Sequence, residues 1–263
     1  MSPRSDTAVA LLALRCLDLT SLKDDDSDTS IETLAARART PHGAPAALCV
    51  YPRFIGAARR ALQAAGLPQV RLATVVNFPR GEASPSDVAR EIDAAVAAGA
   101  DEIDVVFPWR ALLAGDAAAG SRLVAASRRA CDAADRTVLL KVILESGELR
   151  EPHRIVEAGR IAVEQGADFL KTSTGKVAVN ATPEAVGAML QVIREHGGQV
   201  GLKVAGGLTG LAEVKTYLAL AAEVCGEAWL TPRRLRFGAS GLLGVLVSVL
   251  DGDAPAAGTP ASY

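Results

Sequence analysis

The segment PHRIVEAGRIAVEQGADFLKTS, residues 152–173, contains the repeating unit of this chain. Its first part, residues 152–165, mixes alanine, arginine and glutamate with apolar residues and has helical character. Gly166 follows, at the position where the left-handed backbone that ends a helix costs least. Residues 168–173 are short, apolar and typical of a buried strand. The segment therefore predicts a helix, a glycine stop and a strand, in that order.

The same alternation continues in both directions along the chain. Gly66 and Gly99 also separate a helical segment from the apolar segment that follows it. Candidate strands lie near residues 14–18, 47–51, 71–77, 102–107, 138–145, 168–173, 199–204 and 235–239. Candidate helices between them lie near residues 53–65, 86–98, 120–134, 152–165, 183–196 and 211–224.

Eight β/α repeats in 263 residues predict an α/β protein with a single (β/α)8 TIM barrel, which we place at residues 1–251. An open nucleotide-binding sheet would favour a glycine-rich turn after the first strand, and no such turn is present. Residues 252–263, GDAPAAGTPASY, are small and turn-forming. We expect them to form a flexible tail that ends in Tyr263.

Composition narrows the class of function. The formal net charge is −2 and no long run of one sign occurs, which argues against a nucleic-acid partner. The longest apolar run, residues 241–250, is shorter than the roughly 20 residues of a membrane span, so it predicts a buried helix. Four scattered cysteines and the lack of a convincing signal peptide favour a cytoplasmic location. The partner is expected to be a small molecule.

Charged residues are predicted where the strands of the barrel end, and this is where such barrels place their chemistry. Lys171 and Lys203 lie near the ends of two apolar segments, and Asp18, Asp104 and Lys141 lie near the ends of three others. Strand alternation turns these side chains to the face opposite their apolar neighbours, into the barrel. A buried lysine near a second cation keeps a free amine near neutrality, which suits Schiff-base chemistry with carbonyl compounds.

Two alternatives stand beside this interpretation. The buried charges could serve only to pair with one another, as Asp104 and Lys203 could, but so dense a structural network carries a heavy desolvation cost. Cys49, near another strand end, is either a packed thiol or a cavity thiol exposed to aldehydes. Packing is favoured because buried cysteine usually behaves as a small hydrophobe.

Two glycine-rich loops predict a phosphate site. Gly206 and Gly207 follow the seventh strand, and FGASG, residues 237–241, follows the last. Either loop alone would be interpreted as an ordinary turn, but together they fit the place where such barrels bind phosphate. The histidines, His42, His153 and His196, are isolated and lack ligand spacing, so we predict no metal and no cofactor.

Long motifs throughout the chain resemble the deoxyribose-phosphate aldolases, class I aldolases built on a (β/α)8 barrel. The segments that carry the resemblance are LDLT at 17–20, CVYPRF at 49–54, NFPRG at 77–81, GADEIDVV at 99–106, LKVILE at 140–145, FLKTSTGK at 169–176 and FGAS at 237–240. The resemblance implies reversible cleavage of 2-deoxy-D-ribose 5-phosphate to acetaldehyde and D-glyceraldehyde 3-phosphate, through an imine on Lys171.

The resemblance also implies roles for other residues of this chain. Lys203 stays cationic beside Lys171, while Asp104 orients Lys203 and relays protons through water. Asp18 and Thr20 contact substrate hydroxyl groups, and Lys141 tunes the electrostatic field of the cavity. Tyr263 moves a proton at the enamine carbon, as a C-terminal tyrosine does in part of the family. The remaining substrate-binding residues are Thr172, Lys176, Gly206, Gly207, Gly238 and Ser240.

Two departures from the family pattern bear on the substrate. Thr209 stands where many relatives have an arginine, and Gly241 stands where a second serine is expected. Losing one charged contact costs about 1.5–3 kcal/mol of binding, so we expect weaker phosphate binding.

Two other functions stay open: a different Schiff-base aldolase or transaldolase-like enzyme, and a barrel that senses a phosphorylated sugar. The oligomeric state is also open, with a homodimer as one expectation.

Overall fold

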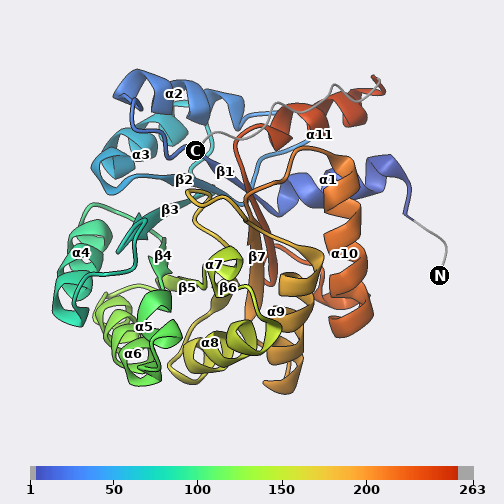
Figure 1. Cartoon of the computed structure of the whole chain (residues 1–263). Helices are drawn as coiled ribbons and strands as arrows, with labels where there is room; N and C mark the ends of the chain where they lie inside the picture. The colour runs from blue at the N-terminus through green and yellow to red at the C-terminus, as the bar shows by residue number, and fades with distance from the viewer. Residues whose placement is uncertain (1–3, 254–263) are drawn as a thin grey trace.

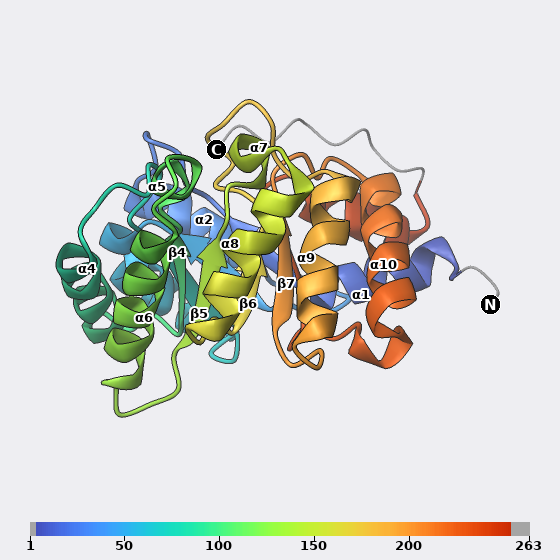
Figure 2. The same ribbon diagram turned by 60° about the horizontal axis from the view of Figure 1, so that its bottom comes forward.

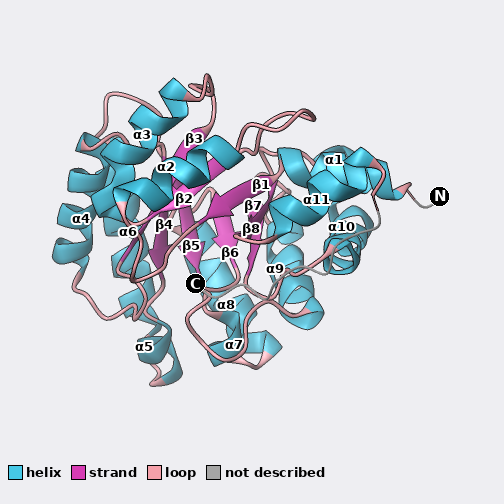
Figure 3. Cartoon of the chain, turned by 90° about the horizontal axis from the view of Figure 1, so that it is seen from above, coloured by secondary structure: helices cyan, strands magenta, loops and turns pink. Residues whose placement is uncertain are grey.

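The computed structural model describes residues 4–253 and shows a closed barrel of parallel strands surrounded by helices (Figure 1). The strands follow one another around the barrel in chain order, and β8 pairs with β1 to close it. Seen from above, the helices form a ring outside the strands (Figure 3). The predicted single (β/α)8 TIM barrel is confirmed.

The strands lie close to their predicted positions. Their bounds are β1 Leu17–Thr20, β2 Ala47–Val50, β3 Arg71–Val76, β4 Glu102–Val106, β5 Leu139–Ile143, β6 Phe169–Lys171, β7 Gly201–Ala205 and β8 Leu235–Ala239. The predicted start of the first strand is wrong, because Leu14 belongs to helix α1, Asp6–Arg15. The Ser5 side chain caps this helix by accepting a hydrogen bond from the Ala8 amide, so the apolar run that follows continues as helix.

The helices between the strands also lie near their predicted positions. Those expected from the sequence are α3 Ile55–Ala64, α4 Pro85–Ala97, α6 Ala117–Asp132, α8 Pro152–Glu164, α9 Pro183–Glu195, α10 Leu211–Cys225 and α11 Leu242–Asp251. Besides α1, the structure adds α2 Asp28–Arg37, α5 Trp109–Leu113 and α7 Ser146–Leu149, with 3-10 turns η1 Pro52–Phe54 and η2 Glu227–Trp229. The short helices α5 and α7 follow β4 and β5 and lie at the same end of the barrel (Figure 2).

The glycine stops act as predicted. Gly66, Gly99 and Gly166 have φ values of 72°, 106° and 93°, in the region that other residues rarely adopt. Each follows a helix and precedes the turn into the next strand. The chain can therefore reverse after each of these helices without backbone strain.

The two faces of each strand have different neighbours. Leu170 and Leu202 belong to the main apolar core, which includes the buried faces of the surrounding helices. Lys171 and Lys203 follow them directly and, by strand alternation, point into the barrel. Both lysines are almost fully buried, at 2% and 1% exposure. The predicted orientation of the two lysines is confirmed.

The barrel interior has an apolar side and a charged side. A separate small cluster consists of Ala47 and Cys49 on β2, Ala73 and Val75 on β3, and Leu22 in the loop after β1. The inward positions of other strands carry buried charged groups, namely Asp18, Glu102, Asp104, Lys141, Lys171, Lys203 and Arg236. The apolar side makes the interior a medium of low polarity, in which charges must be paired.

The predicted tail falls almost entirely outside the described residues. The structure describes only Gly252 and Asp253 of it, and Tyr263 lies beyond them. The apolar run at 241–250 is largely helix α11, as predicted, and Leu242, Leu243, Val245 and Leu246 are buried. Between residues 4 and 253, no helix is both long and apolar enough to cross a membrane.

Candidate active site

Lys171 and Lys203 are neighbours because of strand register. Lys171 is the last residue of β6, and its Cα partner on the adjacent strand β7 is Lys203. In a parallel pair, partner residues project to the same face, so both amines enter the barrel side by side. The prediction that both lysines face the barrel interior agrees with this register.

A single carboxylate joins these amines. Oδ2 of Asp104 accepts hydrogen bonds from Nζ of Lys171 and Nζ of Lys203, each at 2.8 Å. The other oxygen, Oδ1, accepts from Nζ of Lys141 at 2.7 Å. Asp104 is fully buried on β4, with Val75 and Lys141 as its register partners. It therefore bonds directly to the predicted nucleophile as well as to Lys203.

Asp18 and Lys141 lie inside this charged cluster. Asp18 Oδ2 is 2.6 Å from Nζ of Lys203, and its Oδ1 accepts a hydrogen bond from Arg236 at 2.7 Å. Asp18 and Lys141 are both 0% exposed. Contact between Asp18 and a substrate hydroxyl, which the family resemblance implies, stays a prediction; in this structure the Asp18 oxygens face the cations Lys203 and Arg236. The expected influence of Lys141 on the electrostatic field agrees with its place beside Asp104.

Glu102 and Arg236 were not predicted, although both belong to the cluster. Glu102 accepts two hydrogen bonds from Arg236, at 2.9 and 3.2 Å, and lies 2.6 Å from Nζ of Lys141. The signal was present in the sequence. Glu102 lies two residues before Asp104 and Arg236 two before Gly238, so strand alternation turns each to the same inner face.

The pKa of Lys171 is lowered from its ordinary value of 10.5. Burial is the main cause, because an ammonium loses hydration inside the barrel. Asp104 acts in the opposite direction and Lys203 adds to the lowering. The expected direction is confirmed, but burial contributes more than the neighbouring cation.

The pKa of Lys203 is shifted the other way. Burial would lower the pKa of Lys203, but Asp104 and Asp18 outweigh it and raise this pKa well above 10.5. Burial likewise opposes ionisation of Asp104, yet its three lysine partners hold the Asp104 pKa well below 3.8. Lys203 and Asp104 are therefore charged at neutral pH, while Lys171 is the amine whose protonated form is least favoured.

Two predicted substrate-binding hydroxyls are engaged within the protein. The Thr172 hydroxyl donates to the Ala205 carbonyl at 3.1 Å and accepts from the Ala205 amide at 3.0 Å, so it joins β6 to β7. The Thr20 hydroxyl donates to the Asp18 carbonyl at 2.8 Å. Both threonines are buried. In this structure each hydroxyl bonds to the backbone of the protein, and direct substrate contact by either threonine stays a prediction.

Glu145 is a further buried acid that the sequence analysis did not single out as functional. It follows β5 with a φ of 56° and accepts hydrogen bonds from the Thr174 amide at 3.1 Å and hydroxyl at 2.6 Å. Burial raises the pKa of its carboxyl group. Glu145 thereby holds the loop after β6 against the loop after β5. Also in the loop after β6, Nζ of Lys176 donates a hydrogen bond to the Leu22 carbonyl at 2.9 Å.

The glycines after β7 and β8 follow the predicted pattern. Gly206 and Gly207 have φ values of 81° and 77°. A Cβ on Gly206 would lie 2.5 Å from Cβ of Asn180, so the loop after β6 packs directly on this backbone. A Cβ on Gly238 would lie 3.0 Å from Cε of Lys203. Glycine at 238 thus leaves the room that the Lys203 side chain occupies, and half-buried Ser240 follows at the rim.

Replacing Gly206 and Gly207 separately by alanine should separate backbone strain from loop contact. Both variants incur the left-handed cost of about 1–2 kcal/mol, but only Gly206→Ala also displaces Asn180, since nothing lies within 4 Å of a Cβ at Gly207. We expect Gly206→Ala to lower the thermal unfolding midpoint more than Gly207→Ala. Equal midpoints, measured by calorimetry, would contradict the tight packing at Gly206.

Cys49 is packed rather than open to the cavity. It is 0% exposed and belongs to the apolar cluster on β2 and β3. Burial raises the pKa of its thiol. The favoured interpretation, a small hydrophobic residue, agrees with this position.

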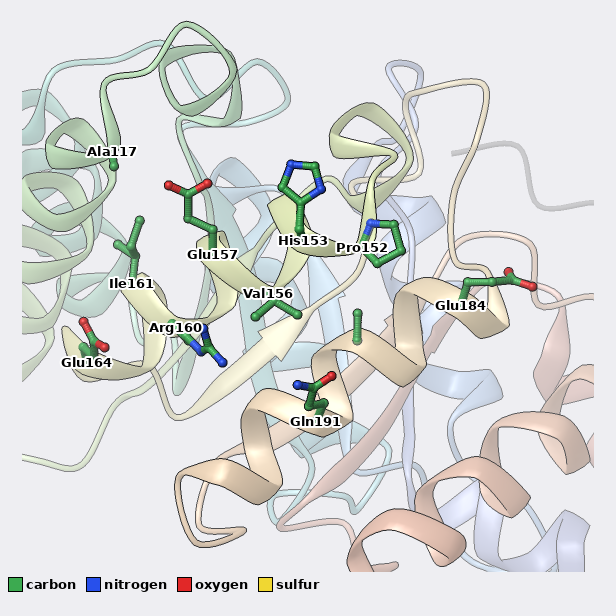
Figure 4. A pocket seen from close by; sticks show the side chains of 11 residues that line it. Ala117, Pro152, His153, Val156, Glu157, Arg160, Ile161, Glu164, Glu184 and Gln191 are labelled. Carbon is green, nitrogen blue, oxygen red and sulfur yellow. The ribbon is translucent and has the colours of Figure 1, made fainter.

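A surface pocket lies between α8 and α9, outside the barrel (Figure 4). His153, Glu157 and Arg160 of α8 and Gln191 of α9 are among the residues that line it. None of its described lining residues comes from a strand, so the pocket is separate from the charged cluster. His153 is exposed.

Comparison with known proteins identifies the family. The profile of the DeoC/LacD family of aldolases matches residues 12–243. Among solved structures, a protein of Toxoplasma gondii ME49 assigned as a deoxyribose-phosphate aldolase is 26% identical, with a TM-score of 0.84 over 94% of this chain and 98% of that one. One of Coccidioides immitis with the same assignment is 26% identical, with a TM-score of 0.77 over 91% and 85% of the two chains.

A more distant structure supports the fold alone. The tetrameric deoxyribose phosphate aldolase of Aeropyrum pernix is 23% identical, with a TM-score of 0.72 over 95% of this chain and 98% of that one. The resemblance inferred from the sequence motifs is confirmed by the family profile, which spans the residues from α1 to α11. The chain belongs to the DeoC/LacD family of aldolases.

Proposed function

We propose that this aldolase reversibly cleaves 2-deoxy-D-ribose 5-phosphate to acetaldehyde and D-glyceraldehyde 3-phosphate through an imine on Lys171. One observation carries the proposal: the Lys171 amine has a lowered pKa and is hydrogen-bonded at 2.8 Å to a carboxylate shared with a cationic lysine. A neutral amine at the carboxyl end of a barrel strand is suited to attack an aldehyde carbon. The names of the relatives support the choice of substrate.

The first half of the reaction forms the imine. Nζ of Lys171 attacks C1 of the open-chain sugar, and the carbinolamine that results loses water to give a protonated imine. This step needs a proton donor and a proton acceptor beside the amine. Asp104 and Lys203 meet that need, because both are in hydrogen-bond contact with each other and Asp104 contacts Lys171.

The second half breaks the carbon–carbon bond. The C3 hydroxyl passes its proton through water to the Asp104 relay, the C2–C3 bond breaks, and the electron pair of that bond passes into the protonated imine to form an enamine. D-glyceraldehyde 3-phosphate leaves, C2 of the enamine takes a proton, and water hydrolyses the imine to release acetaldehyde. Tyr263 is our proposed carrier of the proton to C2; it lies outside the described residues.

Phosphate is proposed to bind at the loops that follow β7 and β8. Gly206, Gly207, Gly238, Ser240 and Lys176 would serve this subsite. Thr209 weakens it, because its hydroxyl donates to Glu213 at 3.0 Å and thus brings a carboxylate to the loop. We therefore propose that unphosphorylated aldehydes compete comparatively well as acceptors.

Trapping the imine tests the proposal. Incubation with acetaldehyde and borohydride should leave an ethyl group on Nζ of Lys171, detected by peptide mass spectrometry. Lys215, a partly exposed surface lysine paired with Asp6, is a control for non-specific modification. An unmodified Lys171 would contradict the imine mechanism and favour a sugar-binding sensor. Assays with other donor aldehydes and ketones test the alternative of a different Schiff-base aldolase, which would accept another donor in place of acetaldehyde.

The pH dependence of turnover follows from the lowered pKa of Lys171. Only the neutral amine attacks, so activity should fall as pH drops through the pKa of Lys171 in the folded protein. Because this pKa lies below 10.5, the acid limb of kcat/KM should also lie below 10.5. A limb at or above the ordinary lysine value would contradict the assignment.

The location and assembly of the protein remain predictions. We propose that the enzyme is cytoplasmic, acts on small-molecule substrates and needs no metal or cofactor. We also propose that it binds neither nucleic acid nor membrane. The oligomeric state is open, with a homodimer as one possibility, and light scattering would test it.

A further inference from the structure

The charged groups inside the barrel form one connected network. In residues 4–253 it joins the carboxylates Asp18, Glu102 and Asp104 to the cations Lys141, Lys171, Lys203 and Arg236. The described network therefore holds three carboxylates and four buried cations, with half-exposed Arg71 as a fifth cation 3.8 Å from Glu102 at its solvent edge. Buried charges are stable only when they are balanced. Four cations would leave one positive charge in excess, whereas a neutral amine at one position balances the network.

The contacts show which cation is in excess. Lys141 lies within 2.7 Å of two carboxylates, Glu102 and Asp104. Lys203 likewise contacts two carboxylates, and Arg236 pairs with Asp18 and Glu102. In the described residues Lys171 forms an ion pair with one carboxylate, Asp104, whose bonded oxygen it shares with Lys203. Within the described part of the barrel, Lys171 is thus the most weakly compensated cation.

Glu102 and Arg236 lie one layer below the reacting end. Each stands two residues before an inward position nearer the carboxyl end of its strand, namely Asp104 on β4 and Gly238 on β8. Their exposures are 0% and 3%. Arg236 also donates to the Pro232 carbonyl at 2.5 Å and lies 5.6 Å from the ring of Phe169. Their depth keeps them from the substrate, so they act through the network.

We propose that Glu102 and Arg236 are positioning residues that set the charge balance of the barrel interior, so that Lys171 is the cation left to lose its proton. The proposal concerns the same site as the proposed aldolase and deepens it. Arg236 supplies the charge that allows Asp18 and Glu102 to remain ionised without drawing a proton to Lys171. Glu102 supplies the charge that keeps Lys141 and Arg236 protonated.

Three other ionisable groups border the network. The buried Cys49 thiol has a raised pKa and is neutral at physiological pH. Arg71 on β3 is 3.8 Å from Glu102, but its side chain is 48% exposed, so water screens it. Glu145 is bound through both oxygens to Thr174; it forms no ion pair with the described amines, but the charge of Lys171 acts on its pKa from a distance. None of the three replaces the charge of Glu102 or Arg236.

Opposite charge changes should move the titration of Lys171 in opposite directions. Arg236→Met leaves an excess of negative charge and should raise the acid limb of kcat/KM by about one pH unit. Glu102→Gln leaves an excess of positive charge and should lower that limb by a similar amount. The double variant Glu102→Gln with Arg236→Met removes one charge of each sign, so its limb should return to the wild-type position.

A direct titration separates this proposal from the proposed reaction. The ¹³Cε signal of Lys171, assigned by its loss in Lys171→Met, reports protonation of the amine without any turnover. If this signal shifts as expected but acetaldehyde leaves no adduct, the charge balance stands and the proposed reaction fails. If the adduct forms but the signal does not shift, the charge balance alone fails.

Two charge-preserving variants test the proposal even if Arg236→Met or Glu102→Gln does not fold. Arg236→Lys keeps the charge but loses the paired geometry, so it should lower stability without moving the limb. The double variant should likewise leave the limb unmoved. A limb that moves in either charge-preserving variant overturns the proposal, as does a limb that moves in the same direction in Arg236→Met and Glu102→Gln. A lowered kcat with an unmoved limb in both single variants would show a merely structural role.

Discussion

Replacing Lys171 by methionine should lower turnover of 2-deoxy-D-ribose 5-phosphate by about 10⁴-fold or more, because no nucleophile remains to form the imine. Methionine fills a similar volume and needs no partner, so the barrel should persist. The desolvation that lowers the pKa of this amine is a cost to the folded state, and the variant removes it. We therefore expect its unfolding midpoint to equal or exceed that of the wild type.

The control for this variant is Lys215→Met. Lys215 lies on α10 and pairs with Asp6 at the protein surface, at 2.7 Å. Its replacement should leave kcat and KM unchanged within the error of a coupled aldehyde assay. Activity that survives in Lys171→Met would move the imine to Lys203 or Lys141, whose amines lie in the same network.

Replacing Asp104 by asparagine should lower both stability and activity. The change leaves three amines without the carboxylate that they share, and removing one partner of a buried ion pair costs about 3–5 kcal/mol. Turnover should fall as well, because the proton relay between Lys171 and Lys203 is lost. Urea unfolding followed by circular dichroism measures the first effect, and a coupled assay the second.

The stability difference between the wild type and Asp104→Asn should depend on pH. The Asp104 pKa in the folded protein lies well below its ordinary 3.8. Its contribution is therefore present in full above about pH 4 and is lost as pH falls through the folded value. The two unfolding curves should approach each other in acid. A difference that grows in acid would contradict the ion-paired state of Asp104.

Asp116→Asn is the matched control for this substitution. Asp116 pairs with Arg122 at 3.3 Å, its side chain is 53% exposed, and it caps α6 by accepting from the Ala119 amide. Asparagine keeps the cap, and an exposed ion pair contributes little. We expect the stability to change by less than about 0.5 kcal/mol. A loss equal to that of Asp104→Asn would show that burial does not set the difference.

Much of the barrel followed from local sequence. The glycine stops at Gly66, Gly99 and Gly166 and the alternation around Lys171 depend only on neighbouring residues. Helix α1 was missed because an apolar run after a capping serine has two outcomes, strand or helix, that periodicity does not separate. Helices α5 and α7 were missed because helices of a few residues depend on packing rather than on their own propensity.

The candidate site was predicted in its parts but not in its connections. Lys171, Lys203 and Asp104 were expected inside the barrel, and they are there. Contact of Asp18 and Thr20 with the substrate stays a prediction; the structure shows only their bonds to protein groups. Glu102 and Arg236 passed unnoticed, because each becomes meaningful only beside the other, and 134 residues separate them.

The sequence by itself determined which strands carry charges and which face each charge takes, because side-chain direction in a strand follows from period two alone. Tertiary structure decided the partners. Closure of β8 onto β1 brings Arg236 to Asp18, and the barrel interior brings Asp104 within bonding distance of three amines. Free energies of buried charges depend on distances across the interior and on exclusion of water. Local sequence sets neither, so the lowered pKa of Lys171 depends on the folded barrel.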